Sequence, residues 1–470
     1  MYTFQDLLEV GKDENKRIDF VYSVINDHKA SELYQNAILA EEYYKRRNRT
    51  ILTYQKILYT ASGQGVPDNF SANYKMCSNF FNFFVTQENQ YLLGNGVQWS
   101  DESTKKTLGK DFDTSLQILG KKALIEGIAF GFWNMDHLES FGVSEFAPLY
   151  DEENGALMAG VRFWQIDKTK PLRATFYEVD GLTEYIWKDG KGEVLRAKRH
   201  YINLTETTVM DGTVIYDGEN YPSFPIVPLW GDDKKQSKIV GLQMDIDAYD
   251  LIKSGFANDI DDASQMYWIL KNAGGMDDLD FNKFIQRIKT THVLDLEDGV
   301  EAESHTQDVP YAAREAMLTR LRDDLFEQEM AYDPKKLASG GSVVTAAIKA
   351  AYQPLNNKTD GYEYCVDEFL SNLLKLIGID DEKPTFTRDV LINQQEQIQV
   401  LTSASDYLPS DYLTKKILLL LGDGDLADDI VKQMQAEEME RLQYQHEQFG
   451  KTSNSEDEDD DKNNDDEPEE

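Results

Sequence analysis

The stretch that decides the fold is YPSFPIVPLWGDDKKQSKIVGLQMDIDAYDLIKSGFANDIDD, residues 221–262. Its first part contains Pro222, Pro225 and Pro228, which exclude a helix there and favour an extended path. After Trp230 and Gly231, apolar residues recur at steps of three or four, so the chain is expected to turn abruptly into one long amphipathic helix. The apolar stripe consists of Leu242, Ile246, Tyr249, Ile252, Phe256 and Ile260. The opposite face carries Asp245, Asp247, Asp250, Lys253 and Asp261.

The sequence before this stretch predicts helices followed by an antiparallel sheet. The expected elements are helices at about 3–60, at 69–99 with an end near Gly94, and at 111–127, then short strands from 128 to about 227. The strand prediction depends on alternation of apolar and polar residues, as in VRFWQI (161–166), ATFYEV (174–179) and TEYIWK (183–188).

The sequence after this stretch predicts two more long helices separated by breakers. We expect the opening helix to run to about Asn272, where Gly274 and Gly275 follow and stop it. The later elements are a short helix at 278–288, a hairpin of 291–296 and 299–304 around Glu297 and Asp298, a helix at 311–330, a helix at 343–377 kinked at Pro354, helical residues at 388–447 and a disordered acidic end. This order predicts an α+β fold that is mainly α.

Composition narrows the classes of function. The 470 residues contain 48 Lys and Arg against 85 Asp and Glu, a net charge of -37, which argues against wrapping nucleic acid. The same charge suits a passage through which DNA moves without sticking. Cys77 and Cys365 show neither a disulfide pattern nor ligand spacing. The N-terminus has charges where a signal peptide would need its apolar core, and runs such as ILLLL (417–421) are too short to span a membrane. We therefore expect a non-secreted soluble protein.

Signatures of catalysis are missing from the sequence. The six histidines form no HExxH pair, and no GxSxG occurs. GKT at 450–452 lacks the glycine that a phosphate loop needs five residues earlier, where Gln445 stands. We therefore predict no enzyme, no metal and no cofactor. A nuclease or protease remains the enzyme alternative, and a head-tail adaptor the structural one.

Four segments in this order resemble the portal proteins of tailed bacteriophages, of the type found in long-tailed phages of Gram-positive bacteria. They are YYKRRNRTI (43–51), FPIVPL with the following IVGLQMDIDAYDLIKSGFANDIDD, WILKNAGG (268–275) and SGGS (339–342). The resemblance covers roughly residues 20–400.

The resemblance implies a division of the chain into named parts. These are a wing at 1–235, a first stem helix at 236–272, a clip at 273–309, a second stem helix at 310–330, a tunnel loop at 331–342, a kinked wing helix at 343–387, a crown at 388–447 and an acidic tail at 448–470. The run 353–357 is a second possible place for the tunnel-loop break.

The resemblance also implies function and partners. The family assembles as a ring, typically of twelve subunits, at one capsid vertex, where double-stranded DNA passes through during packaging and ejection. Expected partners are the terminase motor, head-tail connector proteins, scaffold and the major capsid protein. The expected location is the virion, and the host cytoplasm during assembly.

Three sets of site residues follow from laying the family parts onto this sequence. Tunnel-loop candidates for touching DNA are Lys335, Lys336, Ser339, Gly340 and Gly341, with solvated loop charges as the alternative. Stem candidates for contacts between subunits are Arg314, Arg320, Arg322, Asp323 and Asp324, with ordinary i,i+4 pairing as the alternative. Clip candidates for docking partners are Asp278, Asp280, Lys283, Arg287, Glu297 and Asp298. For YYKRRNRTI, packing or subunit contact is favoured over a nucleic-acid patch.

Overall fold

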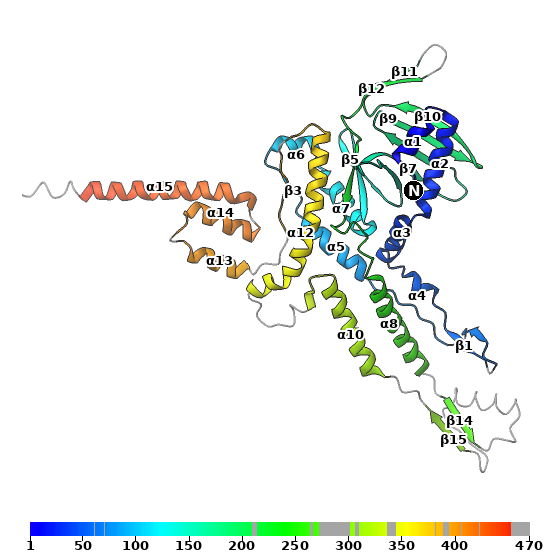
Figure 1. The fold of residues 1–470 in the computed structure, drawn as a ribbon. Coiled ribbons are helices and arrows are strands. Elements are labelled where there is room, and N and C mark those ends of the chain that lie inside the picture. The colour runs from blue at the N-terminus through cyan, green and yellow to red at the C-terminus, as the bar shows by residue number, and fades with distance from the viewer. Residues whose placement is uncertain are drawn as a thin grey trace, which may run out of the picture. The chain divides into compact units, whose positions relative to one another are not determined.

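A computed structural model describes most of the chain (Figure 1). The described residues are 1–60, 62–69, 71–208, 214–263, 267–271, 301–305, 310–335, 345–380, 382–388, 394–405, 407–422 and 424–452. The chain divides into two compact units. The first unit is Met1–Asp333 with Tyr352–Asp389, and the second is Pro334–Ala351 with Val390–Glu470.

The main core of the first unit lies between a helix and a three-stranded sheet. Helix α7 (Phe112–Glu126) buries Phe112, Leu116, Leu119 and Ala123, whose steps of four, three and four put them on one face. It packs on the antiparallel strands β4 (Ile128–Asn134), β5 (His137–Gly142) and β13 (Ile226–Trp230), ordered β13-β4-β5. Pro228 of β13 pairs with Phe130 of β4. Because β13 is an edge strand, the backbone N–H that proline lacks is not needed by a second neighbouring strand.

A second sheet and two N-terminal helices form a separate core. The five strands are β6 (Phe146–Tyr150), β7 (Leu157–Trp164), β8 (Leu172–Glu178), β9 (Gly181–Lys188) and β10 (Lys191–Arg199), paired in sequence order and antiparallel. Apolar residues of α1 (Phe4–Val10) and α2 (Glu14–Ala30) share its buried cluster. Strands β11 (Ile202–Thr208) and β12 (Val214–Glu219) form a further hairpin. The predicted antiparallel β region is confirmed.

The remaining N-terminal elements correct two sequence predictions. They are α3 (Glu32–Tyr44), α4 (Arg49–Thr53), β1 (Ile57–Tyr59), β2 (Gly65–Pro67), α5 (Phe80–Leu93), β3 (Val97–Gln98) and α6 (Glu102–Leu108). The helix expected up to residue 60 was wrong at its end, because Ile57–Tyr59 pairs with Gly65–Pro67 as a hairpin. The helix expected from residue 69 begins only at Phe80, but it ends before Gly94 as predicted.

The long helix of the opening stretch is shorter than expected. Helix α8 spans Gln243–Ala263, and Tyr267–Lys271 is strand β14, which pairs with β15 (Glu301–His305). The prediction that the helix continues to Asn272 was therefore wrong, because the β-favouring run YWIL finds a strand partner farther along the chain. The expected strand at 299–304 is confirmed over residues 301–304, and the expected helix at 278–288 and strand at 291–296 lie outside the described residues.

Two more long helices follow in the sequence. Helix α10 (Tyr311–Gln328) agrees with the prediction, and α12 (Thr345–Leu376) continues through Pro354, so residues 353–357 are not a loop. Whether Pro354 bends the helix stays a prediction. Strand β16 (Thr385–Phe386) pairs with β3.

The second unit is helical, as expected. It contains α13 (Gln394–Ser403), α14 (Ser410–Leu421), the 3-10 turn η1 (Gly424–Leu426) and α15 (Ala427–Thr452). The expected tail boundary at residue 448 was too early, since α15 reaches Thr452; the predicted disorder beyond it lies outside the described residues. Among the described helices, none combines the length and apolar character that crossing a membrane requires.

Candidate functional site: the α8–α10 helix pair

Helices α8 and α10 run antiparallel, side by side, away from the α5 and α7 end of the first unit (Figure 1). Near that end, Tyr249 of α8 and Phe326 of α10 both meet Phe80 of α5, with ring centroids 4.9 and 6.3 Å apart. Farther along, Phe256 meets Tyr311 at 5.5 Å. The predicted apolar stripe of α8 therefore faces α5 and α10 over most of its length.

An extended segment before α5 is bound along α8 by three hydrogen bonds. The backbone N–H groups of Tyr74, Met76 and Ser78 donate to the side chains of α8. Their acceptors are Asn258 Oδ1 at 2.6 Å, Ser254 Oγ at 3.0 Å and Asp250 Oδ1 at 2.8 Å. Alternate residues of the extended segment thus meet every fourth residue of the helix. We call this contact the lacing.

Asp250 is the centre of a buried polar network that extends the lacing to α3 and α4. Its second oxygen accepts from Asn48 Nδ2 at 2.9 Å, while Asn48 Oδ1 accepts from Ile51 N–H and caps α4. The Tyr43 hydroxyl lies 2.5 Å from Asp247 Oδ1 and 3.1 Å from Asn48 Oδ1, and these two acceptors share its single proton. Asp250 is fully buried, and burial raises the pKa of its carboxyl, although the bonds from Asn48 and Ser78 oppose this.

A charged cluster joins both helices to α5 and α12. Glu88 of α5 is 1% exposed and pairs with Lys238, which precedes α8, at 3.2 Å and with Lys358 of α12 at 3.0 Å. Lys358 also pairs with Glu329, just after α10, at 2.5 Å. Burial alone would lower the pKa of Lys358, but Glu88 and Glu329 outweigh it and raise that pKa. Lys358 is therefore charged at neutral pH and fixes the ends of α8 and α10 to the same place.

The chain that leaves α10 is also held firmly. Arg322 binds Asp333 through two hydrogen bonds of 2.8 Å and lies 4.5 Å from the ring centre of Phe326. Tyr332 stacks on Tyr352 of α12, with centroids 4.2 Å apart. The backbone N–H of Tyr332 donates to Gln87 Oε1 at 3.0 Å, and Gln87 Nε2 donates to the backbone carbonyl of Tyr332 at 2.9 Å. The position of the chain is thus fixed up to Asp333.

This arrangement is an antiparallel helix pair anchored on a packed body, with no cluster of three metal-ligating side chains in the part of the chain that the structure describes. A family model described as phage portal protein, SPP1 Gp6-like, matches residues 23–451. The chain belongs to the phage portal protein family. The portal prediction made from the residues is confirmed, and the head-tail adaptor alternative is not supported.

Relatives of this portal chain include two curated phage proteins. The portal protein of Clostridium phage phiCD119 is 27% identical over 252 residues, which are 48% of this chain and 55% of that protein. The match therefore spans about half the length of that relative. The portal protein of Bacillus phage SPP1 is 24% identical over 427 residues, 81% of this chain and 79% of that protein. Among solved structures, a chain in the neck of an empty GTA particle is 12% identical, with TM-score 0.42, covering 73% of this chain and 90% of that one.

The stem residues predicted for this portal chain have partners within one chain. Arg314 pairs with Asp259 of α8, and Arg322 pairs with Asp333. Arg320 and Asp324 form an exposed i,i+4 pair at 3.8 Å, and Asp323 lies 3.5 Å from Arg322. Arg320 thus makes the ordinary i,i+4 pair that was the alternative to a contact between subunits. Contacts between subunits, which one chain does not test, stay a prediction.

The other predicted sets fall largely outside the described residues. Lys335 is exposed, whereas Lys336, Ser339, Gly340 and Gly341 are outside. The clip candidates are likewise all outside, namely Asp278, Asp280, Lys283, Arg287, Glu297 and Asp298.

The lacing was missed by the sequence analysis, which placed Asp247 and Asp250 on the face of the helix opposite the apolar stripe and gave that face no partner. In the structure Asp250 is fully buried, bonded to Asn48 at the start of α4 and to Ser78 of the extended segment. The available signal was the spacing of Asp250, Ser254 and Asn258, three short polar side chains at steps of four. In YYKRRNRTI, Tyr43 and Asn48 are buried against α8, as the packing interpretation expects.

Proposed function

We propose that this chain assembles into a ring at one vertex of a phage capsid and that the ring is the channel for DNA packaging and ejection. The observation that carries the proposal is the antiparallel α8–α10 pair, fixed at one end by the Glu88 charged cluster. Such pairs, set side by side around an axis by identical contacts, close a cyclic wall. The net charge of -37 keeps the wall from trapping a polyanion.

The parts of the chain take the roles that the family suggests. The wing is residues 1–235 with the helix α12, the stem is α8 with α10, and the clip is the segment between them. The tunnel loop is 331–342, the crown is 388–447, and the acidic tail follows. Arg322 and Gln87 hold Asp333 and Tyr332 where the chain leaves the stem, which supports a loop whose first residues are anchored.

The partners and location follow from the same proposal. The terminase motor and the head-tail connector dock on the clip, and scaffold and the major capsid protein surround the ring during assembly. The ring lies in the virion and forms in the host cytoplasm. The chain itself performs no catalysis, so the energy for moving DNA comes from the docked ATPase.

Electron microscopy of the purified protein with a mass measurement by light scattering tests the ring. We expect closed rings with a central hole and a mass of about a dozen subunits. A closed dimer that persists at high protein concentration would overturn the proposal.

The tunnel-loop proposal has its own test. Replacing Lys335 and Lys336 by Glu is expected to leave ring assembly intact and to change DNA packaging, because the reversed charges repel phosphate. The measurement is the rate of packaging and the length of packaged DNA. The matched control is Lys349→Glu, an exposed lysine in α12. Normal rate and length in the double variant would show that these lysines are ordinary solvated charges.

A further inference from the structure

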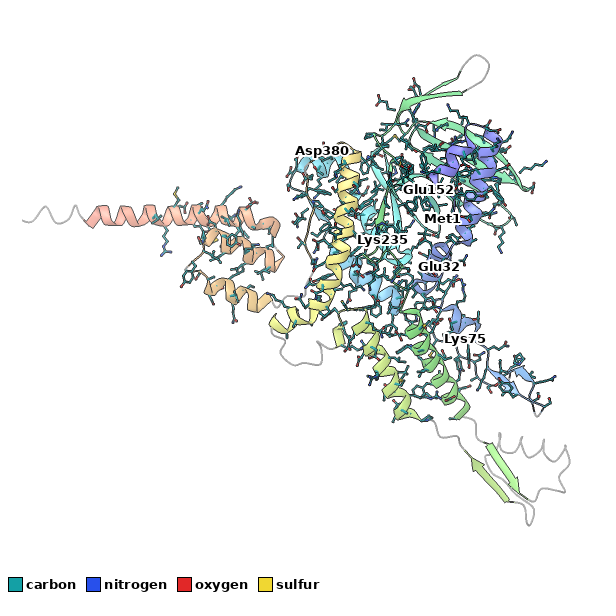
Figure 2. The ribbon with its side chains drawn as sticks, viewed as in Figure 1. Met1, Glu32, Lys75, Glu152, Lys235 and Asp380 are labelled. Carbon is teal, nitrogen blue, oxygen red and sulfur yellow. The ribbon has the colours of Figure 1, made fainter. Side chains whose placement is uncertain are left out.

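Two short connections of the first unit link its main core to its second core. Helix α2 contributes Ile25 to the second core, and α3, which starts after the cap residue Ser31, contributes Ala37 to the main core. Figure 2 labels Glu32, the first residue of α3. The other connection is residues 143–145, which lead from β5 of the three-stranded sheet to β6 of the five-stranded sheet. Side chains of α2 and α7 hold this second connection, and we call the two connections together the joint.

His28, in the last turn of α2, holds the joint from the side of the second core. Its Nε2 lies 2.8 Å from the Val143 carbonyl oxygen, and because a carbonyl can only accept, Nε2 carries the proton. The ring is 2% exposed, with the rings of Tyr34 and Phe163 at centroid distances of 5.5 and 6.0 Å. Among the residues that the structure describes, Nδ1 has no hydrogen-bond partner. The contact therefore suits the neutral ring, since a second proton on Nδ1 would be buried without an acceptor.

Glu126, the last residue of α7, holds the joint from the side of the main core. Its Oε2 accepts from Ser144 N–H at 2.9 Å, and its Oε1 lies 3.2 Å from Ser144 Oγ. The side chain is 2% exposed, and the β5 backbone covers it so closely that a Cβ on Gly142 would lie 2.2 Å from Oε1. A protonated carboxyl fits this contact, because Oε2 can still accept from the N–H while Oε1 donates to the Ser144 hydroxyl.

The groups that face Glu126 do not offset its burial. Burial is the largest effect on its pKa, and Glu41 of α3 adds repulsion, so the pKa of the carboxyl is raised to about 7. Lys122 of α7 and the bonds from Ser144 oppose this shift, but the Lys122 ammonium is also paired with Glu145 at 3.2 Å. Tyr34 of α3 also faces the carboxyl, whose charge helps to raise the pKa of that phenol. The joint therefore favours an uncharged Glu126.

The groups around His28 likewise leave burial dominant. Burial lowers the pKa of the imidazole, while the bond to Val143 opposes this shift. Of the charged neighbours on its own helix, Asp27 favours the protonated ring and Lys29 disfavours it. The Lys29 ammonium lies over the ring of Phe163, 5.1 Å from its centre, on the strand β7 that packs against α2. The joint therefore favours an uncharged His28 as well.

We infer that the joint is a pH-sensitive coupling between the two cores, closed with His28 and Glu126 both uncharged and opened more readily when either side chain becomes charged. The inference concerns the single chain and does not rest on the proposed ring. Opening exposes both side chains to water, where the carboxyl loses its proton above about pH 4.5 and the imidazole gains one below about pH 6.5. Rising pH therefore favours opening through Glu126, falling pH favours it through His28, and in the wild type each effect partly offsets the other.

Hydrogen exchange across residues 142–146 of the full chain, measured by mass spectrometry at pH 5, 6.5 and 8, tests the inference. The Ser144 N–H donates to Glu126, so its exchange requires the joint to open. Dividing the exchange rate of an unstructured peptide by the measured rate at the same pH gives a protection factor. The quantity compared is the ratio of the protection factor of a variant to that of the wild type, because a packing change that is the same at every pH leaves this ratio constant.

Glu126→Gln tests the side of the main core. The amide keeps an acceptor and a donor for Ser144 but cannot ionise, so its ratio should be about tenfold or more higher at pH 8 than at pH 5. Gly142→Ala, whose new Cβ leaves the carboxyl no room, should shift the ratio in the same direction with Glu126 still present. Glu193→Gln, on a side chain that is 64% exposed, is the matched control and should show one ratio at all three pH values.

His28→Gln tests the side of the second core. Its amide keeps an N–H for the Val143 carbonyl but takes up no proton, so its ratio should be about threefold or more higher at pH 5 than at pH 8. The direction is thus opposite to that of Glu126→Gln. His137→Gln, on a side chain that is 55% exposed, is the matched control and should show a constant ratio.

Three outcomes would overturn the inference. Ratios that stay constant with pH in both variants would make His28 and Glu126 purely structural contacts. A shift in only one variant would leave a single titrating group in place of a two-sided coupling. Shifts of equal size in residues 366–374 of α12, in the main core, would assign the pH response to unfolding of the whole first unit. Opposite shifts confined to the joint are the expected result.

Discussion

The α7 core of the wing and the α8–α10 pair are stabilised by different interactions. Around α7, large side chains such as Phe130 and Phe146 are completely buried, with ring centroids 4.5 Å apart. Along α8 the apolar stripe becomes progressively exposed, from Ile246 at 3% to Ile260 at 53%. The α7 core is complete within one chain, whereas the helix pair leaves apolar surface exposed in the single chain.

Polar contacts add a second kind of support in the α8–α10 region. The lacing and the Glu88 cluster link segments far apart in sequence, and the Arg322–Asp333 pair holds the chain where it leaves α10. Hydrogen bonds and ion pairs are directional, so they fix the direction in which a projecting helix pair points. Apolar burial, which has no direction, stabilises the wing body.

Phe130→Ala should have the largest effect and tests the wing side of the comparison. Removing a fully buried ring is expected to lower the free energy of unfolding by about 3–5 kcal/mol, because a cavity remains. Its counterpart Ile260→Ala, in the exposed part of α8, should cost about 0.5 kcal/mol or less in the separate chain. Urea denaturation of both variants measures the difference. Equal losses would contradict the distinction between the two regions.

Glu126 at the end of α7 gives the wing core a pH dependence. Burial raises the pKa of its carboxyl to about 7 from 4.5, although hydrogen bonds from Ser144 oppose the shift. The folded chain therefore retains a proton that the unfolded chain loses, so the free energy of unfolding falls as pH rises from about 4.5 to about 7. The total loss is about 3 kcal/mol.

The variant Glu126→Gln should remove most of this pH dependence. It is expected to be more stable than the wild type at pH 8 and about as stable near pH 5, measured by urea denaturation at both values. Glu193→Gln, on an exposed side chain, is the matched control and should follow the wild type. An unchanged pH slope in the Glu126 variant would show that Glu126 is not the group responsible.

Asp250→Asn tests the polar side of the comparison. The amide can still accept from Ser78 N–H, but its NH2 group meets the NH2 group of Asn48, so we expect a loss of about 1–3 kcal/mol. Hydrogen exchange should accelerate at the Ser78 amide more than in α7. Asp245→Asn, the same change on the same helix, is the control. Unchanged exchange at Ser78 would mean that the lacing does not depend on Asp250.

Arg320→Ala should have the smallest effect on a single chain. The Arg320 side chain is 80% exposed and its pair with Asp324 is long, so a loss of about 0.5 kcal/mol or less is expected in the separate chain. The informative measurement is the stability of assembled rings in rising salt. A clear loss there, with none in the separate chain, would support the predicted contact between subunits.

Much of the fold was predictable because local pattern and tertiary packing agree. The four apolar positions of α7, the alternation in β7 to β9 and the proline-marked β13 each need only one short window of sequence. The end of α8 was not predictable in this way. Residues 267–271 form a strand because they pair with 301–305, about thirty positions farther on.

The candidate site was less predictable than the fold. An aspartate on the polar face of an amphipathic helix usually lies in water, and Asp250 does not, because an extended segment 172 positions away covers it. The exposed hairpin was also missed, since a three-residue strand such as Ile57–Tyr59 gives too short a pattern to separate from the end of a helical region.

The lacing joins an extended chain to a helix, and the two advance by different lengths at each step, which limits how long the lacing can be. Two residues of extended chain advance about 6.6 Å, while four residues of helix advance about 6.0 Å, so the two advances differ by about 0.6 Å at each step. Three hydrogen bonds, from Ser78 to Tyr74, tolerate an accumulated mismatch of about 1.2 Å. In a longer series the mismatch would exceed hydrogen-bond distance. The contact therefore fixes one register between the extended segment and α8.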